Sequence, residues 1–318
     1  MVVFDFFKCN KEELLTSYCE YFSLDYLKTK EYLEKANRET IDEETVIKEL
    51  GLNLNNFDSC KASIIAKHMN TTTVEGIESF RNHGVLDLKR MLKDENDLTK
   101  AMKESGITID YDNYLLNIED KQYPLNISTG SCEVCLKGND KSCSKYFSCE
   151  FKEKLYHLSL KLYKDKATIE FFISGTMEDM KRYSTINRYP EILEIIAQVR
   201  AQQKGKSYPD YSICFEWMRK HPLCIVIEFV VKLSEIESFN PISSDSWFDE
   251  YESCLEFCNY SYDDFINNNV PKKFFDNLYL VRQFNSFYFW GNSERYGSLL
   301  EDQIVNPENI VNVLEVQG

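Results

Sequence analysis

The first stretch with potential for chemistry runs from an apolar segment through a histidine into a series of hydroxyl side chains. Residues 62–67 are mostly apolar, His68 follows, and Thr71 to Thr73 come just before the next apolar pattern. A polar side chain at the end of a strand, beside a helix N-terminus, is placed to hold a ribose hydroxyl or a phosphate. His68 and Thr71 are therefore candidate binding residues. The alternative is a capped helix after an edge strand, with His68 exposed.

Four thiols lie close together farther along the chain. They occur within 18 residues, at Cys132, Cys135, Cys143 and Cys149. Four thiolates can form a tetrahedral structural zinc site, which leaves no coordination position open for a substrate. Only the first pair has the C-x2-C spacing that standard zinc motifs repeat. Reduced, unliganded thiols are therefore the alternative to zinc.

Two later stretches each combine predicted strands with chemically useful side chains. Over residues 167–183, a strand that ends in aromatic residues turns through Ser-Gly-Thr into a helix, and Tyr183 follows Phe172 by eleven positions. Near the end of the chain, Glu301 opens a predicted strand, and Glu294 is a competing carboxylate in the preceding loop. The alternatives are a pair of core aromatics and a solvated glutamate at a strand edge.

The order of these stretches resembles the ADP-ribosyltransferase superfamily. A strand, His68, threonines, a helix and Gly84 are similar to its first motif, and Phe172 with Tyr183 resembles the aromatic pair of poly(ADP-ribose) polymerases. Glu301, just before the last strand, is similar to the catalytic glutamate of the third motif. The resemblance covers residues 61–318 and rests on the order of the motifs, since each short motif alone is common.

The resemblance implies a substrate and a role for each residue. NAD would be the substrate, and ADP-ribose would pass to a macromolecular acceptor, either protein or nucleic acid. His68 would hold a ribose hydroxyl, and Phe172 and Tyr183 would stack on nicotinamide. Beside Tyr183, the basic patch of Arg182, Arg188 and Lys181 could meet the pyrophosphate, and solvated helix residues are the alternative. Glu301 would stabilise the positive charge that builds on the ribosyl carbon as nicotinamide leaves.

Two departures from the superfamily pattern limit these expectations. Phe172 stands where the polymerases carry tyrosine, so a face for stacking is kept but the hydrogen bond of a phenol is lost. Leu299 stands two residues before Glu301, where arginine-specific members carry Gln or Glu. This second departure argues against modification of arginine.

Two other functions remain open. One is a non-enzymatic interaction protein of the same fold, whose acidic surface binds a basic partner or an inhibitory or regulatory protein. The other is an enzyme similar to tRNA 2′-phosphotransferases, which would need several arginines to hold an RNA phosphate. The sequence offers Arg81, Arg90, Arg182 and Arg188 near the first two motifs.

The elements that must position these residues form an α+β pattern. Strands and helices do not alternate regularly enough for a parallel doubly wound sheet. We expect an N-terminal helical segment over residues 1–60, with a boundary near Cys60. An ADP-ribosyltransferase-like domain over 61–318 would follow, with a split, mostly antiparallel sheet and a Cys-rich insertion at 131–150.

Hydrophobic periodicity predicts the individual elements. Helices are expected within 11–50, with one beginning near Asp42 and ending before Gly51, and over 74–81, 177–183 and 190–201. Strands are expected over 62–67, 155–163, 167–173, 223–233, 287–290, 303–305 and 310–316.

Composition excludes several classes of protein. The chain has 37 Lys and Arg against 52 Asp and Glu, a formal net charge of −15, which disfavours a sequence-independent DNA coat. Aromatic residues make up 14% of the chain, too many for a disordered acidic protein. No signal peptide and no apolar run of about 20 residues is evident, so we expect a cytoplasmic protein without a membrane partner. Together with the resemblance, this suggests a toxin or a defence effector.

Overall fold

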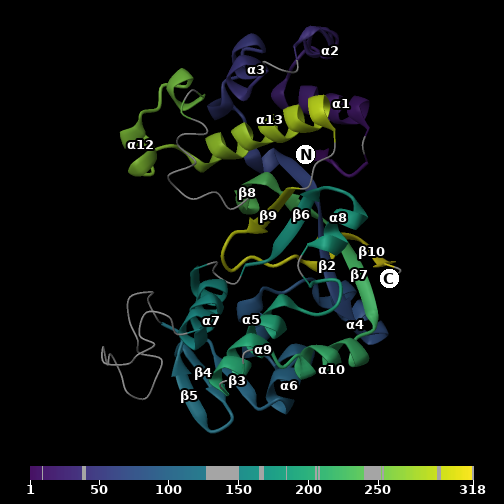
Figure 1. Ribbon diagram of the computed structural model, residues 1–318. Helices are drawn as coiled ribbons and strands as arrows, with labels where there is room; N and C mark the ends of the chain where they lie inside the picture. The colour runs from purple at the N-terminus through teal and green to yellow at the C-terminus, as the bar shows by residue number, and fades with distance from the viewer. Residues whose placement is uncertain are drawn as a thin grey trace.

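The computed structural model is an α+β protein built around a mostly antiparallel sheet, as the sequence predicts (Figure 1). Helices lie on both sides of this sheet, and a second, smaller sheet lies in the lower part of the molecule. The structure describes residues 1–8, 10–37, 41–126, 150–164, 168–183, 185–204, 206, 208–239, 252, 254–291 and 295–316.

The main sheet is organised around two long neighbouring strands. β2 and β7 pair antiparallel without interruption from Ser63↔Lys232 to Thr72↔Leu223. The strand order is β10–β7–β2–β6–β9–β8, with β1 parallel to the first part of β2. The strands are β1 (Val2–Phe4), β2 (Ala62–Thr72), β6 (Glu170–Ser174), β7 (Leu223–Lys232), β8 (Ile236–Phe239), β9 (Arg295–Leu299) and β10 (Ile310–Val316).

One edge of β2 is shared by two strands. β1 pairs with Ala62–Ile64, and β6 pairs with β2 farther along, at Lys67↔Phe172. This is the only registered pair between β2 and β6 among the described residues, whereas β6 pairs with β9 from Glu170↔Ser298 to Ser174↔Arg295. Of the neighbouring strands in the described sheet, β2 and β6 therefore have the shortest paired segment.

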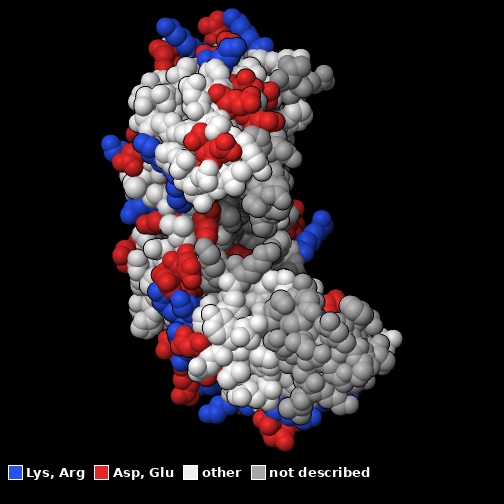
Figure 2. All heavy atoms as spheres, turned by 90° about the vertical axis from the view of Figure 1, so that its left-hand side faces the viewer, with Lys and Arg blue, Asp and Glu red and all other residues white. Residues whose placement is uncertain are grey.

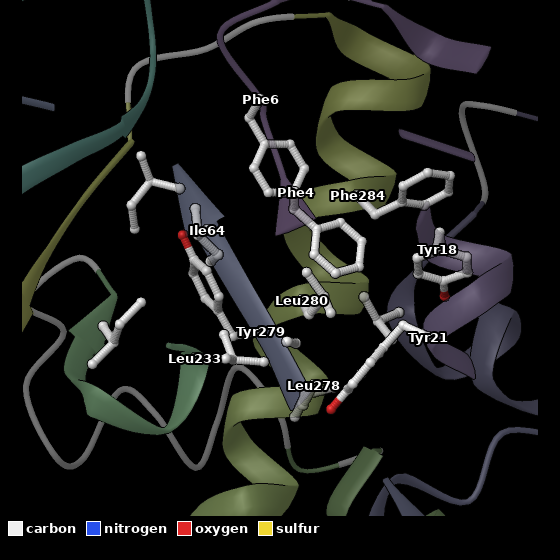
Figure 3. Packing of buried hydrophobic residues seen from close by; sticks show 14 of the residues in the cluster. Phe4, Phe6, Tyr18, Tyr21, Ile64, Leu233, Leu278, Tyr279, Leu280 and Phe284 are labelled. Carbon is white, nitrogen blue, oxygen red and sulfur yellow. The ribbon is translucent and has the colours of Figure 1, made fainter. Parts of the chain in front are cut away.

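The upper face of the sheet carries the largest hydrophobic cluster. The helices on this side of the sheet are α1 (Lys11–Phe22), α2 (Tyr26–Lys35), α3 (Glu43–Glu49), α12 (Tyr262–Ile266) and α13 (Lys272–Trp290). Three short 3-10 turns accompany them: η1 (Leu54–Asn56), η2 (Ser59–Lys61) and η4 (Leu233–Glu235). Figure 3 shows Tyr18 of α1 against Phe284 of α13, and their ring centroids are 4.0 Å apart. Ile64 of β2 belongs to the same cluster. Residues on both sides of the boundary expected near Cys60 thus share one core.

The lower part of the molecule has a core of its own. The elements that form it are α5 (Leu88–Lys93), α6 (Asp97–Glu104), β3 (Ile107–Asp110), β4 (Leu115–Ile118), β5 (Lys121–Pro124), α7 (Glu150–Ser159), the π-helical turn η3 (Leu160–Lys164), α9 (Glu191–Gln203) and α10 (Ser212–Lys220). α4 (Val74–His83) packs on the larger cluster through Ile77 and Phe80. Residues from α5 to α10 form a separate hydrophobic cluster around Leu116, Leu158 and Trp217. α8 (Met177–Arg182) lies against the sheet instead, where Met180 contacts the small cluster of Met69 and Phe172.

Several predicted elements are confirmed where local signals are strong. α3 begins after Asp42, whose side chain accepts a hydrogen bond from the backbone of Thr45. α4 ends at Gly84, which has a positive φ of 78°. The predicted helices at 177–183 and 190–201 and the strands at 223–233 and 310–316 are also present, with shifted ends.

Three predicted strands are wrong. Residues 155–163 form the end of α7 and η3, because Leu155, Leu158 and Leu162 recur at helical spacing and are all buried. Residues 287–290 are the last turn of α13, where an aromatic run continues a buried helical face. Of residues 303–305, Val305 alone pairs, in an isolated bridge with Val85. In the described part of the chain, no helix is long and apolar enough to span a membrane.

Candidate functional site

Chemically useful side chains gather at the waist of the molecule, where the main sheet meets the lower lobe. They come from β2, η3, β6, the end of α8, the start of α9 and β9. We call them the waist cluster: His68, Lys161, Glu170, Phe172, Tyr183, Glu191 and Tyr296. Figure 2 shows acidic side chains on the described surface in the middle of the molecule.

His68 is held by the strand next to its own. β2 continues to Thr72, so His68 lies within the strand, partly buried, and not at its end. Its Nδ1 is 2.8 Å from the carbonyl oxygen of Glu170. A carbonyl only accepts, so Nδ1 donates the proton and Nε2 of the neutral ring keeps a lone pair. Burial lowers the pKa of His68, which favours this neutral form.

Phe172 and Tyr183 are in contact, but they do not form an open sandwich. Their ring centroids are 5.4 Å apart and their planes lie at 84°, an edge-to-face arrangement. This contact leaves no space for a flat ligand ring between them. Tyr183 also packs against Tyr296, with ring centroids 5.4 Å apart. Burial, followed by the charges of Glu170 and Glu191, raises the pKa of Tyr183 to about 12.

Lys161 joins the two carboxylates of the waist cluster. Its Nζ is 2.8 Å from Oε1 of Glu170 and 3.3 Å from Oε2 of Glu191. Burial alone would lower the pKa of Lys161, but the two carboxylates outweigh it and raise the pKa well above its usual range. The side chains of Glu170 and Glu191 are 42% and 38% exposed, so both remain accessible to a ligand.

The sheet separates His68 from the aromatic pair. Lys67 is paired with Phe172, so the two side chains share a face, and His68 leaves β2 on the opposite face. Its ring nitrogen reaches the backbone of Glu170 on β6. Glu170 is thus approached by His68 at its backbone and by Lys161 at its carboxylate.

Glu301 lies outside this cluster. It is exposed in the turn after β9, where its charge acts on Lys89 and Tyr111. The next residue, Asp302, is 2.9 Å from Lys89 of α5. The charges that act on His68 and Tyr183 belong instead to other members of the waist cluster.

The first and third motifs nevertheless meet in space. Val85 and Val305 exchange backbone hydrogen bonds of 2.9 and 3.0 Å. Gly84 is required at this contact, because a Cβ there would lie 1.8 Å from the carbonyl oxygen of Val305. The glycine that ends α4 therefore allows close packing against the segment that follows Glu301.

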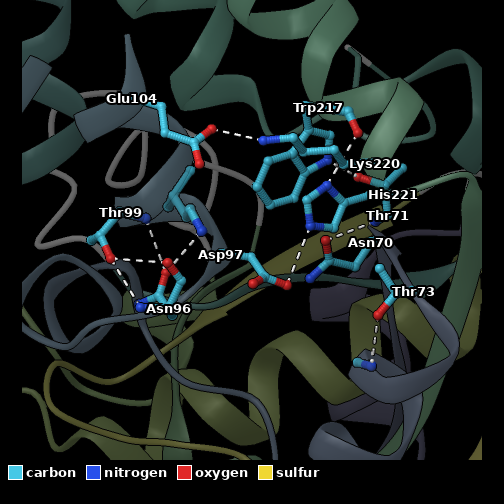
Figure 4. A network of polar contacts seen from close by, with 12 residues as sticks. Asn70, Thr71, Thr73, Asn96, Asp97, Thr99, Glu104, Trp217, Lys220 and His221 are labelled. Atoms are coloured by element: carbon cyan, nitrogen blue, oxygen red, sulfur yellow. Dashed lines mark hydrogen bonds and ion pairs between the residues drawn. The ribbon is translucent and has the colours of Figure 1, made fainter. Parts of the chain in front are cut away.

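Thr71 is buried at the joint between β2 and the lower lobe (Figure 4). Its Oγ1 accepts a hydrogen bond of 2.8 Å from Nε1 of Trp217. The indole stacks on His221 with ring centroids 3.7 Å apart, and Nε2 of His221 is 3.2 Å from Asp97 of α6. In this arrangement the Thr71 hydroxyl serves a structural contact.

Thr71→Val is expected to destabilise the protein by about 1–3 kcal/mol, because it leaves the buried indole N–H of Trp217 without its acceptor. Thr71→Ser keeps the hydroxyl and should lose clearly less. Urea unfolding followed by circular dichroism measures both variants. Equal stability of Thr71→Val and the wild type would show that this hydrogen bond does not hold the joint.

The remaining residues predicted to form a site are one arginine, one glutamate and four cysteines. Arg182 is exposed on α8. Glu294 and the four thiols Cys132, Cys135, Cys143 and Cys149 lie outside the described residues, so the second carboxylate and the zinc site stay predictions. Within the described ranges, no group of three or more His, Cys, Asp and Glu side chains is arranged to hold a metal ion.

Sequence analysis missed four members of the waist cluster: Lys161, Glu170, Glu191 and Tyr296. Glu170 had a usable signal, because it precedes Phe172 by two residues and so shares its face of β6. Lys161 lay in a segment predicted as a strand. Glu191 and Tyr296 reach the site only through tertiary packing.

Comparisons with known proteins identify no relative: no family model matches the chain, and no curated protein or solved structure shows significant similarity to it.

Proposed function

We propose that the chain is an enzyme similar to ADP-ribosyltransferases, which binds NAD at the waist cluster and transfers ADP-ribose to a macromolecular acceptor. The observation that supports this is the backbone contact between segments of three motifs that are far apart in the sequence. β2, which carries His68, pairs with β6 at Lys67↔Phe172, and Val85 pairs with Val305, close after Glu301.

The side chains at the waist suit the chemistry of this reaction. The free Nε2 of neutral His68 can accept a hydrogen bond from a ribose hydroxyl. Tyr183 offers a ring face to nicotinamide, and nearby carboxylates can stabilise the positive charge that develops on the ribosyl carbon. NAD would be consumed as a substrate in this reaction. We also propose that the main sheet corresponds to the split sheet of the ADP-ribosyltransferase superfamily.

The contact between Phe172 and Tyr183 must open for nicotinamide to bind. Tyr183 is the C-terminal cap of α8, a helix of six residues, so a local movement of this cap would be enough. The same closed contact favours a second candidate function. In that alternative, the chain is a non-enzymatic interaction protein, and the aromatic pair is part of its core.

The arginines fit an RNA 2′-phosphate less well. Arg81 is 2.8 Å from Glu78, and Arg90 pairs with Asp87 and donates to the carbonyl of Asp302. These two side chains are already engaged with acceptors of the protein. Arg81 and Arg90 therefore give little support to a tRNA 2′-phosphotransferase activity.

Incubation of the full chain with NAD labelled in the nicotinamide ring, with and without cell lysate, tests the proposal. We expect release of nicotinamide, and Tyr183→Ala should weaken NAD binding by about tenfold because it removes a stacking partner. Phe215→Ala, at a 65% exposed position of α10, is the matched control and should leave binding unchanged. If calorimetry detects no NAD binding and no nicotinamide is released, the proposal of an enzyme is wrong and the non-enzymatic interaction protein is the function that remains.

A further inference from the structure

We propose that Glu170, and not Glu301, is the catalytic carboxylate of this site, and that Lys161 is the positioning residue that holds it. This inference rests on the proposed reaction with NAD. The packing of β6 points to Glu170, whereas the sequence motifs point to Glu301, which follows the end of β9.

The first argument is the place of Glu170 among the other site residues. Its side chain leaves β6 on the same face as Phe172, two residues away. Its carbonyl accepts the hydrogen bond of His68, and its charge is felt by both His68 and Tyr183. Glu170 thus contacts His68 through its backbone carbonyl, while its carboxylate lies on the face of the sheet that carries the aromatic pair.

The second argument is the kind of element that carries each carboxylate. Glu170 is the first residue of β6, and its strand is paired with β9 at Ser298. Lys161 fixes its Oε1 at 2.8 Å, while 42% of the side chain remains exposed. Glu301 lies in an exposed turn, next to Asp302 with its left-handed φ of 63°. Catalytic groups on strands keep their geometry better than groups in turns.

The third argument is the local structure that presents Lys161. Lys161 lies in η3, a π-helical turn that continues the chain directly after α7. Such turns are rare and are often found at functional sites, because they turn a side chain away from the regular helical position. Here the turn directs one ammonium group to two carboxylates, Glu170 and Glu191.

The chemical step balances without any redox partner. The bond between the ribosyl C1′ and the nicotinamide nitrogen breaks, and its electron pair leaves with neutral nicotinamide. The positive charge that remains on the ribosyl ring is stabilised by the carboxylate of Glu170. A hydroxyl group of the acceptor, or water, then adds to C1′ and releases its proton to solvent.

Matched carboxamide variants of the full chain test the assignment. Glu170→Gln should lower kcat for nicotinamide release by about 100-fold or more, with NAD affinity in calorimetry unchanged. Glu301→Gln should keep the wild-type kcat. Lys161→Met should lower kcat while KM stays constant, and Lys161→Arg should restore much of the loss because the guanidinium can still pair with Glu170.

The outcomes separate this inference from the proposed function. A wild-type chain that neither binds NAD nor releases nicotinamide would overturn the proposed function and this inference together. An active wild type in which Glu301→Gln is inactive and Glu170→Gln is active would overturn the inference alone. Melting temperatures verify that each variant is folded, and Glu170→Asp, which keeps the charge, replaces Glu170→Gln if that variant does not fold.

Discussion

Phe284→Ala is expected to lower the free energy of unfolding by about 3–5 kcal/mol, which is the usual effect of removing a fully buried aromatic side chain. Phe284 lies on α13, near the end of the chain, and its ring stacks on Tyr18 of α1 at 4.0 Å. Its loss therefore opens a cavity between the N-terminal helices and α13. Urea unfolding monitored by circular dichroism measures the effect.

Three companion variants make this prediction specific. Phe215→Ala removes a ring that is 65% exposed and should change stability by less than about 0.5 kcal/mol. Tyr18→Phe should be neutral or stabilising, because the buried Tyr18 hydroxyl has no hydrogen-bond partner among the described residues. In a double-mutant cycle, Tyr18→Ala and Phe284→Ala should be coupled by about 0.5–1.5 kcal/mol. Additive losses would indicate that the two rings contribute to stability without interacting energetically.

Gly84→Ala should destabilise the protein by about 2–6 kcal/mol. A side chain at φ 78° and ψ −160°, a conformation essentially restricted to glycine, costs about 1–3 kcal/mol, and forcing a methyl group into packed atoms costs about 1–3 kcal/mol more. The methyl group would lie 1.8 Å from the carbonyl oxygen of Val305, so the Val85–Val305 bridge must separate. Thermal unfolding of the variant measures the loss.

Gly51→Ala is the matched control for Gly84→Ala. Gly51 also has a positive φ, 64°, but no atom lies within 4 Å of the Cβ that alanine would add. We expect only the backbone cost, about 1–2 kcal/mol. Equal losses at the two positions would mean that the contact between the first and third motifs contributes nothing to stability.

Local sequence signals were sufficient for a part of the fold. Asp42 accepts a hydrogen bond at the start of α3, and Gly84 ends α4, because capping depends on residues within one turn of the helix. The β-branched run of β7 predicted a strand because such side chains fit a buried pleated surface. These elements were predicted because the deciding contacts lie close together in the chain.

Short apolar runs were harder to interpret. The segment 155–163 satisfies both an alternating pattern and a helical pattern, and the run at 287–290 is apolar on every side. Periodicity cannot distinguish a buried strand from a buried helix over so few residues. Tertiary packing decides that both segments are helical, because α7 packs on α9 and α13 is covered by α1 and the sheet.

For the site, the sequence by itself determined which side chains are available and in what order: His68, then Phe172 and Tyr183, then Glu301. Only the tertiary structure decided which of them meet. It closed Phe172 against Tyr183, left Glu301 in an exposed turn, and brought Lys161 to Glu170. The physical reason is that periodicity reports which face of an element is buried, whereas the partner of that face depends on how distant elements pack together.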